Sequence, residues 1–311
     1  MKLRELLGAI ADLAQWSEHP ALDGDVKGLS TNSLACQPGE VFIGMPGTRV
    51  DGGEFWSGAI AQGAIAAIVS QSAYAKAQEL LAGMVPGPCL IPAADMAIAC
   101  AQLATAFHHH PASKLKLVGV TGTNGKTTTT HLIEFLLNAA QQPTALLGTL
   151  YTRWPGFQQT AVHTTPFAVE LQKQLAEAVA ADCEYGVMEV SSHALAQGRV
   201  WGCTFEGGVF TNLTQDHLDY HRDMENYFAA KALLFSPDYL RGRAIVNLDD
   251  PYGQRLAAQA PQNRVWTYST HNSGADLWTG NLTYEAASVK GLLHTQTGNA
   301  EFVSPPLGQF N

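Results

Sequence analysis

The sequence is poor in charge and in cysteine, and it lacks any long run of purely apolar residues. Charged residues make up 14% of the 311 positions, and 18 Lys and Arg stand against 27 Asp and Glu, so the formal net charge is −9. This shortage of basic residues argues against general nucleic-acid binding, because such surfaces need positive charge to neutralise phosphates. The hydrophobic share of 46% supports a sizeable core and excludes wholesale disorder.

The cysteines exclude a disulfide framework. There are five, an odd number, and no two form a Cys-x-x-Cys pair, which indicates a reducing compartment. The first sixteen residues mix charged and apolar side chains, so they predict an amphipathic helix and not a signal peptide. The uncharged stretches 55–75 and 96–113 are rich in alanine and only weakly apolar, so we expect buried helix and strand there and no membrane span. A cytoplasmic location is expected.

The first third of the chain has a mixed pattern that ends at Pro111-Ala112-Ser113. Strands are expected at 40–45, 66–70 and 89–91, and helices at 55–63 and 96–110. Asp95 is placed to cap the second helix. The short break predicts a domain boundary, which gives domains 1–111 and 112–311.

Beyond that break, buried strand-like runs alternate with helical stretches. The expected strands are 116–120, 144–150, 185–190, 208–213, 244–248 and 264–268, and the expected helices are 127–141, 168–181, 224–235 and 251–260. This alternation predicts βαβ units and a mostly parallel sheet, and residues 277–302 alternate like antiparallel strands at a sheet edge. The fold class is therefore α/β: a mixed α/β domain followed by a mostly parallel-sheet domain.

The most informative segment is LVGVTGTNGKTT at 117–128, where a strand leads into a glycine-rich turn, a Lys-Thr pair and a helix. Glycines let backbone N–H groups point at phosphate oxygens, and the helix N-terminus adds a positive dipole. Lys126 would reach the β and γ phosphates of ATP, and Thr127 would hold Mg²⁺. The segment departs from the strict phosphate-loop pattern at Val120, where that pattern has its first glycine. The alternative is an ordinary glycine turn before a helix.

Charged and histidine side chains stand after two of the expected strands. Glu189 closes an apolar strand, and His217 lies in the run TNLTQDHLDYH at 211–221. Because α/β sheets bind ligands at the carboxyl ends of parallel strands, the acid suits Mg²⁺ and the second cluster suits another metal site. Two plainer interpretations stay open: Glu189 as a solvated acid, and Asp216 with Asp219 as caps of the following helix.

Two further features have plain interpretations by themselves. Lys231 lies on an apolar helix, where a lone lysine usually extends its amine to solvent. The consecutive histidines His108, His109 and His110 would point in different directions on a helix, so we interpret them as a helix end before Pro111 and not as a metal site.

The form TGTNGKT at 121–127 resembles the phosphate loop of the Mur ligase and folylpolyglutamate synthase superfamily, whose members form amide bonds with ATP. Other segments extend the resemblance to one family, the UDP-N-acetylmuramoyl-tripeptide synthetases (MurE). They are collinear over most of the chain: GTNGKTT (122–128), HTTP (163–166), EVSSHALAQGRV (189–200), TNLTQDHLDYH (211–221) and AKALLF (230–235). The stretch SSHALAQGRV is the most specific to this family.

The resemblance implies a ligase of peptidoglycan synthesis. It would use ATP to add a diamino acid to UDP-N-acetylmuramoyl-L-alanyl-D-glutamate through an acylphosphate; we expect meso-diaminopimelate rather than L-lysine only because that branch is common. It further implies a monomer without nucleic-acid or membrane partners. The last residues, GQFN at 308–311, resemble a family segment that precedes the last helix of the central domain. The chain is therefore expected to be a fragment that lacks the amino-acid-binding C-terminal domain and is inactive alone.

The resemblance also implies the site residues. ATP contacts fall on Gly122, Thr123, Asn124, Gly125, Lys126, Thr127 and Thr128. Contacts to the UDP-substrate fall on Leu29, Ser30, Thr48, Arg49, Val50, His163, Thr164, Thr165, Ser191, Gln197 and Arg199. The implied catalytic residues are Lys126, Glu189, His217 and Lys231. Of two implied Mg²⁺ ions, one is held by Thr127 and Glu189, and the other by Glu189, His217 and Lys231, whose amine would carry CO₂ as a carbamate.

The sequence departs from the family pattern at two places, and a third residue, Arg199, has an alternative interpretation. Thr31-Asn32-Ser33 stands where the family usually has Asp-Ser-Arg, and His163 stands where many relatives have Asn. Arg199 suits a substrate carboxylate because its planar fork is permanently charged, and its alternative is a surface arginine that ends a helix.

Two other functions stay open. One is another amide ligase of the superfamily, such as a different Mur ligase or a folylpolyglutamate synthase. The other is a nucleotide-dependent switch or binding module without ligase chemistry. The combination of Glu189, His217 and Lys231 with a separate N-terminal domain argues against the second.

Overall fold

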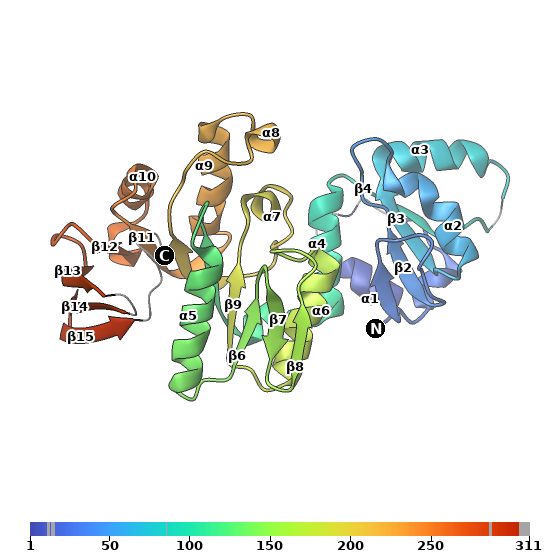
Figure 1. Cartoon of the computed structure of the whole chain (residues 1–311). Coiled ribbons are helices and arrows are strands. Elements are labelled where there is room, and N and C mark those ends of the chain that lie inside the picture. Colours follow the sequence, from blue (N-terminus) through green and yellow to red (C-terminus); the bar gives the residue numbers. More distant parts are fainter. Residues whose placement is uncertain (11–12, 14–15, 85, 286–287, 305–311) are drawn as a thin grey trace. The chain divides into compact units, whose positions relative to one another are not determined.

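The computed structural model of the chain describes residues 1–10, 13, 16–84, 86–285 and 288–304, and the chain forms two compact units (Figure 1). Unit 1 comprises Met1–Pro111, Phe167–Glu177 and Gln197–Gly202. Unit 2 comprises Ala112–Pro166, Ala178–Ala196 and Cys203–Asn311. The segment GQFN at 308–311, which resembles the family segment before the last helix of the central domain, lies outside the described residues.

Unit 1 is built on a four-stranded parallel sheet in the order β1-β2-β3-β4. Its strands are β1 (Gly28–Ser30), β2 (Glu40–Ile43), β3 (Ala66–Ser70) and β4 (Leu90–Ala93). Its helices are α1 (Leu3–Gly8), α2 (Trp56–Ala61), α3 (Gln71–Leu80) and α4 (Met96–Phe107), with short 3₁₀ turns η1 (Pro20–Asp23) and η2 (Gly52–Phe55).

The strands of unit 1 bury side chains on both faces. Val41 and Ile43 of β2 belong to one apolar cluster with side chains of α1 and α4, whereas Phe42 packs in a second cluster with Ala59 of α2 and Ala73 of α3. Successive side chains of a strand point to opposite faces, so helices on both faces require continuously apolar strands. This explains why the strand segments EVFI and AAIVS read as apolar runs without alternation.

Unit 2 contains an eleven-stranded sheet in the order β15-β14-β13-β12-β11-β10-β5-β9-β6-β7-β8. The strands are β5 (Lys116–Thr121), β6 (Thr144–Leu147), β7 (Tyr151–Trp154), β8 (Phe157–Thr160), β9 (Tyr185–Glu189), β10 (Phe205–Phe210), β11 (Leu240–Asn247), β12 (Val265–Ser269), β13 (Leu277–Tyr284), β14 (Val289–Thr295) and β15 (Gly298–Ser304). Strands β13 to β6 in this order pair in parallel, and antiparallel strands flank them on both edges.

Helices and 3₁₀ turns connect these strands. They are η3 (Pro111–Lys114), α5 (Lys126–Ala139), α6 (Ala168–Ala180), α7 (Ser192–Ala196), α8 (Leu218–His221), α9 (Met224–Ala232), η4 (Leu233–Phe235), α10 (Pro251–Gln259) and η5 (Gln262–Arg264). The predicted α/β class, the mostly parallel sheet and its antiparallel edge at 277–302 are confirmed.

Several predicted boundaries were wrong for identifiable reasons. The strand expected at 208–213 is β10, Phe205–Phe210; the pair Gly207-Gly208 hid its start, because glycine is depleted in strands. The helix expected over 96–110 ends at Phe107, because His109 and His110 adopt left-handed φ values of 58° and 54°. The expected N-terminal helix is only α1, which ends at Gly8, and residues 11–12 and 14–15 lie outside the described part.

Several elements were not predicted, among them the strands β7 and β8 and the helix α3. Residues 151–160 form the hairpin β7–β8, which turns at Pro155-Gly156, where Gly156 has a φ of 83°. A Pro-Gly pair between strand-like segments is a turn signal that would have found it. Helix α3 begins at Gln71, and its N-cap Ser70 accepts a hydrogen bond from the N–H of Ala73.

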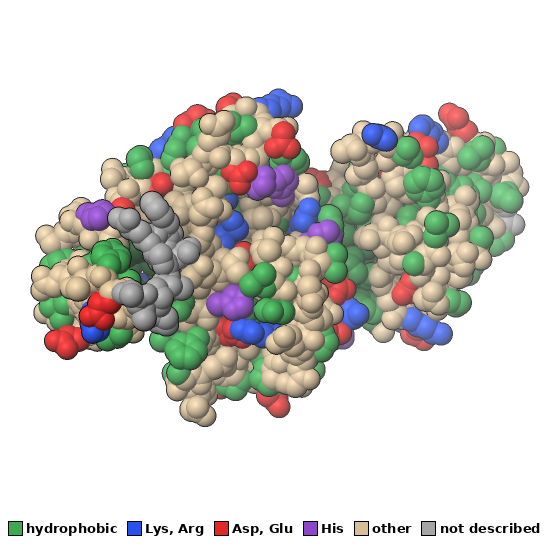
Figure 2. Space-filling model, in the orientation of Figure 1, with side chains coloured by type: hydrophobic (Ala, Val, Ile, Leu, Met, Phe, Trp, Pro, Cys, Tyr) green, Lys and Arg blue, Asp and Glu red, His purple; other side chains and the backbone are tan. Residues whose placement is uncertain are grey.

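In the part of the chain that the structure describes, no helix combines the length and the apolar character that a membrane span requires. Figure 2 shows acidic and basic side chains interspersed over the visible face, so the net charge of −9 is not gathered into one patch there.

Candidate functional site

The phosphate-loop segment lies where the sheet of unit 2 changes direction. The chain leaves β5 toward β6, on the side of β5 where β9 also lies, whereas β10, β11 and β12 follow each other on the opposite side of β5. Such a switch point, at the carboxyl ends of the strands, is where α/β sheets bind ligands. Gly122 (φ 151°) and Gly125 (φ 83°) adopt backbone conformations that favour glycine, and Gly125 is the N-cap of α5. The loop is thus a glycine turn that delivers a helix N-terminus to the switch point.

Lys126 folds back over this loop. Its Nζ donates hydrogen bonds to the carbonyl oxygens of Gly122 and Thr123, both at 2.9 Å. Burial lowers the pKa of Lys126, and the nearby carboxylates of Glu189 and Asp216 oppose this shift. A cation held over the loop carbonyls in this way is placed to meet an anion entering the loop.

Glu189 is almost fully buried, with 1% of the residue exposed, so its interpretation as a solvated acid is wrong. Its Oε1 accepts hydrogen bonds from Thr127 Oγ1 at 2.9 Å and from Thr149 N at 2.8 Å, and its Oε2 accepts one from Thr149 Oγ1 at 3.1 Å. The Thr127 hydroxyl and the Glu189 carboxylate offer hard oxygen ligands, the type that Mg²⁺ prefers. They also lie close enough to each other to contact one ion. Thr127 and Glu189 therefore fit a magnesium ion beside the phosphate loop.

Lys231 is also buried, with 1% exposed, so the solvent-extended interpretation of this lysine is wrong. Its Nζ donates to the carbonyl oxygen of Gly122 at 2.8 Å and lies 4.7 Å from the ring centre of Tyr227. Burial lowers the pKa of Lys231 far below the usual lysine value, the positive charge of Lys126 lowers it further, and Asp216 acts in the opposite direction. Two lysines from separate helices thus share one loop carbonyl.

His217 is half-exposed and adopts a left-handed φ of 52° at the N-cap of α8. Its ring lies 4.8 Å from that of His193 and 6.2 Å from that of Tyr227, and its Nε2 is 3.4 Å from Asp216 Oδ2. The interpretation of Asp216 and Asp219 as helix caps is wrong: the cap of α8 is His217, without a side-chain bond, and α9 is capped by Asp223.

The unit 2 residues expected to contact the UDP-substrate lie beside Glu189. Thr165 Oγ1 donates to the backbone oxygen of Glu189 at 2.8 Å and accepts from Ser191 N at 3.1 Å. Thr149 Oγ1 lies 3.1 Å from Thr164 Oγ1, within hydrogen-bond distance. His163 precedes these two threonines in the same segment. The HTTP segment and the end of β9 therefore form one hydrogen-bonded unit.

The remaining expected substrate residues belong to unit 1. Arg199 donates from Nε to Gln197 Oε1 at 2.9 Å, and its guanidinium carbon lies 3.8 Å from the ring centre of Phe167. The alternative, a surface arginine that ends a helix, is wrong, because α7 ends at Ala196 and the Arg199 side chain is held on both sides.

The other unit 1 candidates lie at the carboxyl ends of β1 and β2. Leu29 and Ser30 are on β1, and residues 48–50 form an exposed turn in which Gly47 N donates to Val50 O at 3.0 Å. The turn leads into Asp51, which accepts from Gly53 N at 2.8 Å and from Ser72 Oγ at 3.1 Å. A network of backbone and hydroxyl donors thus fixes the residue that follows the turn.

Several residues with contacts in the site were not predicted, among them Thr149, Tyr227 and Asn212. Thr149 bonds Glu189, and Tyr227 OH lies 3.2 Å from Thr123 Oγ1. Asn212 contacts the loop backbone, although the sequence showed it only as part of a longer run. Only the strand-end position of Asn212 was a signal. Within the described residues, no group of three or more His, Cys, Asp or Glu side chains is arranged to hold a metal.

Both parts of the chain match models of known protein families. Residues 120–311 match the Mur ligase middle domain, and residues 25–109 match the Mur ligase family catalytic domain. The chain belongs to the Mur ligase family. The match to the middle domain begins at the end of β5 and so includes the phosphate loop, Glu189, His217 and Lys231.

Individual Mur ligases align with the chain over its full length. It is 64% identical over 312 residues to a UDP-N-acetylmuramoyl-L-alanyl-D-glutamate--2,6-diaminopimelate ligase of Trichormus variabilis, which covers 100% of this chain and 62% of the relative. A ligase of the same name from Synechocystis sp. is 60% identical over 319 residues, with the same coverage. A solved structure of a ligase with this name aligns with a TM-score of 0.80 and 30% identity, over 100% of this chain and 61% of that one. The chain therefore spans about 62% of the length of these curated relatives.

Proposed function

We propose that this chain is the N-terminal and central part of an ATP-dependent ligase that adds meso-diaminopimelate to UDP-N-acetylmuramoyl-L-alanyl-D-glutamate in peptidoglycan synthesis. The observation that carries the proposal is the convergence on the phosphate loop: Lys126 and Lys231 donate to the same Gly122 carbonyl, and Glu189 bonds Thr127. The 64% identity to a diaminopimelate ligase across the whole chain supports this choice of reaction.

The proposed reaction begins with phosphoryl transfer. The free carboxylate of the substrate's D-glutamate attacks the γ-phosphorus of ATP, the bond to the β–γ bridging oxygen breaks, and an acylphosphate and ADP result. The ammonium of Lys126, now withdrawn to loop carbonyls, would turn to the β and γ phosphates and offset their charge. The amine of diaminopimelate then displaces phosphate and forms the amide bond.

The residues around Glu189 fit magnesium. Thr127 and Glu189 would hold one ion, and Glu189 with His217 and a carbamylated Lys231 would hold a second; such ions neutralise charge on the transferring phosphoryl group. The buried Lys231, with its lowered pKa, favours the neutral amine that CO₂ requires. The neutral amine nitrogen would bond to the carbon of CO₂ and release one proton, which converts a neutral amine into an anionic oxygen ligand.

The substrate contacts are divided between the two units. Leu29, Ser30 and the turn 48–50 in unit 1 would hold the UDP end, which makes residues 1–111 the UDP-binding domain. His163, Thr164, Thr165 and Ser191 in unit 2, with Gln197 and Arg199, would hold the muramoyl-dipeptide. The site for the diamino acid is expected in the part that the longer relatives have beyond this match. We expect a cytoplasmic monomer without nucleic-acid partners.

Ligand binding and turnover test this function. Thermal-shift and calorimetric titrations should show that the chain binds Mg-ATP and UDP-N-acetylmuramoyl-L-alanyl-D-glutamate but no folate, and that it forms no tripeptide alone. Binding of a folate instead would favour a folylpolyglutamate synthase. Acceptor-independent ATP hydrolysis would favour a nucleotide switch, and tripeptide synthesis by the 311-residue chain would overturn its inactivity as a fragment.

A further inference from the structure

Asn212 stands two residues beyond β10, and its carboxamide contacts both backbone groups of one loop residue. Asn124 N donates to Asn212 Oδ1 at 2.9 Å, and Asn212 Nδ2 donates to the carbonyl oxygen of Asn124 at 3.2 Å. A third bond runs from Thr123 N to the backbone oxygen of Asn212 at 3.0 Å. One residue outside the loop thus fixes two consecutive residues within it.

The neighbouring Thr211 acts on the same carbonyl. Its Oγ1 lies 2.6 Å from the oxygen of Asn124 and 3.3 Å from that of Thr121. A Cβ added to Gly122 would lie 1.9 Å from Thr211 Oγ1, so the end of β10 packs directly against the loop. Asn247 of β11 supports Thr211 from behind, because its Nδ2 donates to the Thr211 carbonyl at 2.8 Å.

These hydrogen bonds also determine which N–H groups of the loop are already occupied and which can face a ligand. The N–H groups of Thr123 and Asn124 are both committed to Asn212. The first N–H groups of a helix have no partner within the helix, so those of Lys126 and Thr127 at the start of α5 are the ones directed at an incoming phosphate. Asn212 therefore holds the loop at Thr123 and Asn124 and leaves the N–H groups of Lys126 and Thr127 available to the ligand.

We propose that Asn212, assisted by Thr211, is a positioning residue that holds the phosphate loop open for the nucleotide. This inference rests on the proposed ATP-dependent function. A glycine-containing loop that had to order only on binding would lose conformational entropy at that moment, and this loss would weaken affinity. A loop ordered in advance by the end of β10 avoids that loss. Asn212 need not touch ATP to act in this way.

The same bonds join the loop to the segment that carries His217. Thr214 N donates to Thr123 Oγ1 at 3.0 Å, and Thr123 Oγ1 donates to the Thr214 carbonyl at 3.2 Å. The run from Thr211 to His217 is thereby attached to the loop at both Asn124 and Thr123. Loss of the Asn212 amide would therefore loosen the placement of this segment together with the loop.

Calorimetric titration of the 311-residue chain with Mg-ATP tests the proposal. Asn212→Ala should weaken Mg-ATP binding about tenfold, as the loss of one to two hydrogen bonds implies. Asn212→Asp should weaken it at least as much, because a carboxylate oxygen would face the Asn124 carbonyl in place of a donor. Binding of UDP-N-acetylmuramoyl-L-alanyl-D-glutamate, measured in parallel, should not change.

Two sets of controls separate positioning from folding. Asn272→Asp makes the same chemical change at a distant Asx turn, where Asn272 Oδ1 accepts from Gly274 N at 2.9 Å, and should leave Mg-ATP affinity unchanged. Thr211→Ser keeps the hydroxyl and should bind Mg-ATP as the wild type does, whereas the isosteric Thr211→Val should bind it several-fold more weakly. This pair keeps the test decisive if the Asn212 variants fail to fold.

The outcomes are distinguishable. If the wild type binds Mg-ATP and Asn212→Ala, or Thr211→Val in its place, binds it equally well, the positioning role is overturned and the proposed function stands. Equal weakening of Mg-ATP and UDP-substrate binding would also overturn it, because that pattern indicates general damage. If the wild-type chain binds no Mg-ATP at all, the proposed function and this inference both fail.

Discussion

Lys126 is the first residue of α5, and its ammonium group contacts loop carbonyl oxygens. We expect this group to leave those carbonyls for the phosphates when ATP binds. In a chain extended to the full length of its relatives, we predict that Lys126→Ala lowers ADP formation by at least about 100-fold, because an electrostatic stabiliser of the transferring phosphoryl group is removed. The fold should survive, since the change removes a partly buried positive charge whose bonds are to the loop itself. Coupled-enzyme detection of ADP with circular dichroism as the folding control checks this, and near-normal turnover would refute the phosphate-loop assignment.

Lys231 offers a separate test at the same scale, because its proposed role requires a covalent change. We predict that Lys231→Ala in the extended chain loses activity and that short carboxylic acids partly restore it. A small carboxylate would occupy the space left by the lysine side chain and replace the carbamate oxygens. Activity should be measured against added acetate and formate, with Lys126→Ala as the control that neither acid rescues. Full activity of Lys231→Ala without additives would end the carbamate hypothesis.

The five cysteines are all buried thiols outside any disulfide, so their reactivity reports on folding. Burial raises the pKa of Cys100 to about 12 and the pKa values of Cys89 and Cys183 to about 11. At pH 8 these thiols should therefore stay protonated and react slowly with Ellman's reagent in the native chain, whereas all five should react at once in urea. Fast stoichiometric labelling of the native protein would contradict the buried positions.

At the scale of elements, the sequence indicated the strands and helices with strong local patterns and missed those that depend on partners. The β5–loop–α5 unit was predictable because its glycines, Lys-Thr pair and apolar strand are contiguous. The hairpin β7–β8 was missed because all four residues of β8 are exposed and carry no apolar alternation. Asn212 was missed for another reason: its contacts reach a loop 88 positions earlier, and no local pattern records such a pairing.

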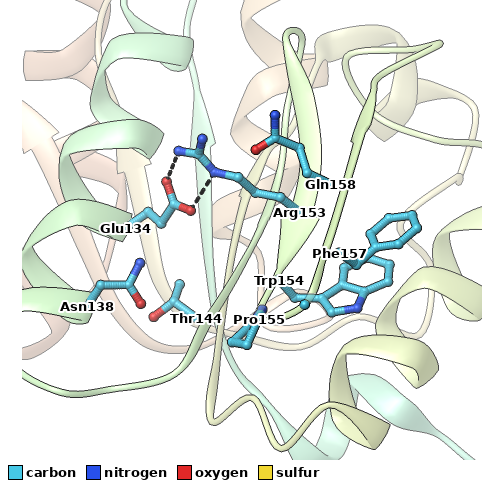
Figure 3. Close-up of a pocket in the computed structure, with 9 residues that line it drawn as sticks. Glu134, Asn138, Thr144, Arg153, Trp154, Pro155, Phe157 and Gln158 are labelled. Atoms are coloured by element: carbon cyan, nitrogen blue, oxygen red, sulfur yellow. Dashed lines mark hydrogen bonds and ion pairs between the residues drawn. The ribbon is translucent and has the colours of Figure 1, made fainter.

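An ion pair beside a cavity of about 490 Å³ links the hairpin to the phosphate-loop helix (Figure 3). Arg153 of β7 donates from Nε to Oε1 of Glu134 on α5 at 2.7 Å, and its Nη2 contacts the other oxygen; the Glu134 side chain is only 8% exposed. We predict that Arg153→Met destabilises the chain by about 2–3 kcal/mol, because it leaves a buried carboxylate unpaired. The Arg153→Met, Glu134→Leu double variant should recover most of that loss in urea unfolding. Additive losses would show that the pair is not coupled.

At the scale of the whole molecule, the two units carry different halves of the proposed chemistry. Unit 1 has its own sheet, two apolar clusters and the residues proposed for the UDP end, whereas the sheet of unit 2 carries the phosphate loop, Glu189, His217 and Lys231. A ligand that binds only the native state of one unit suppresses local opening in that unit first. Mg-ATP and the UDP-substrate should therefore leave different footprints on the same chain, because only the UDP-substrate has proposed contacts in unit 1.

We predict these footprints in hydrogen exchange followed by mass spectrometry. Mg-ATP should slow exchange in peptides that contain 122–130, 211–217 and 227–231. UDP-N-acetylmuramoyl-L-alanyl-D-glutamate should slow it in peptides that contain 28–30, 48–52, 163–165 and 191–199. At a ligand concentration of 100 times the dissociation constant, protection should approach about 2.7 kcal/mol where opening requires release of the ligand. Mg²⁺ without nucleotide is the control and should leave the peptides from 28–30 and 48–52 unchanged. Protection by Mg-ATP confined to unit 1 would contradict the division of labour, because none of the proposed ATP contacts lies there.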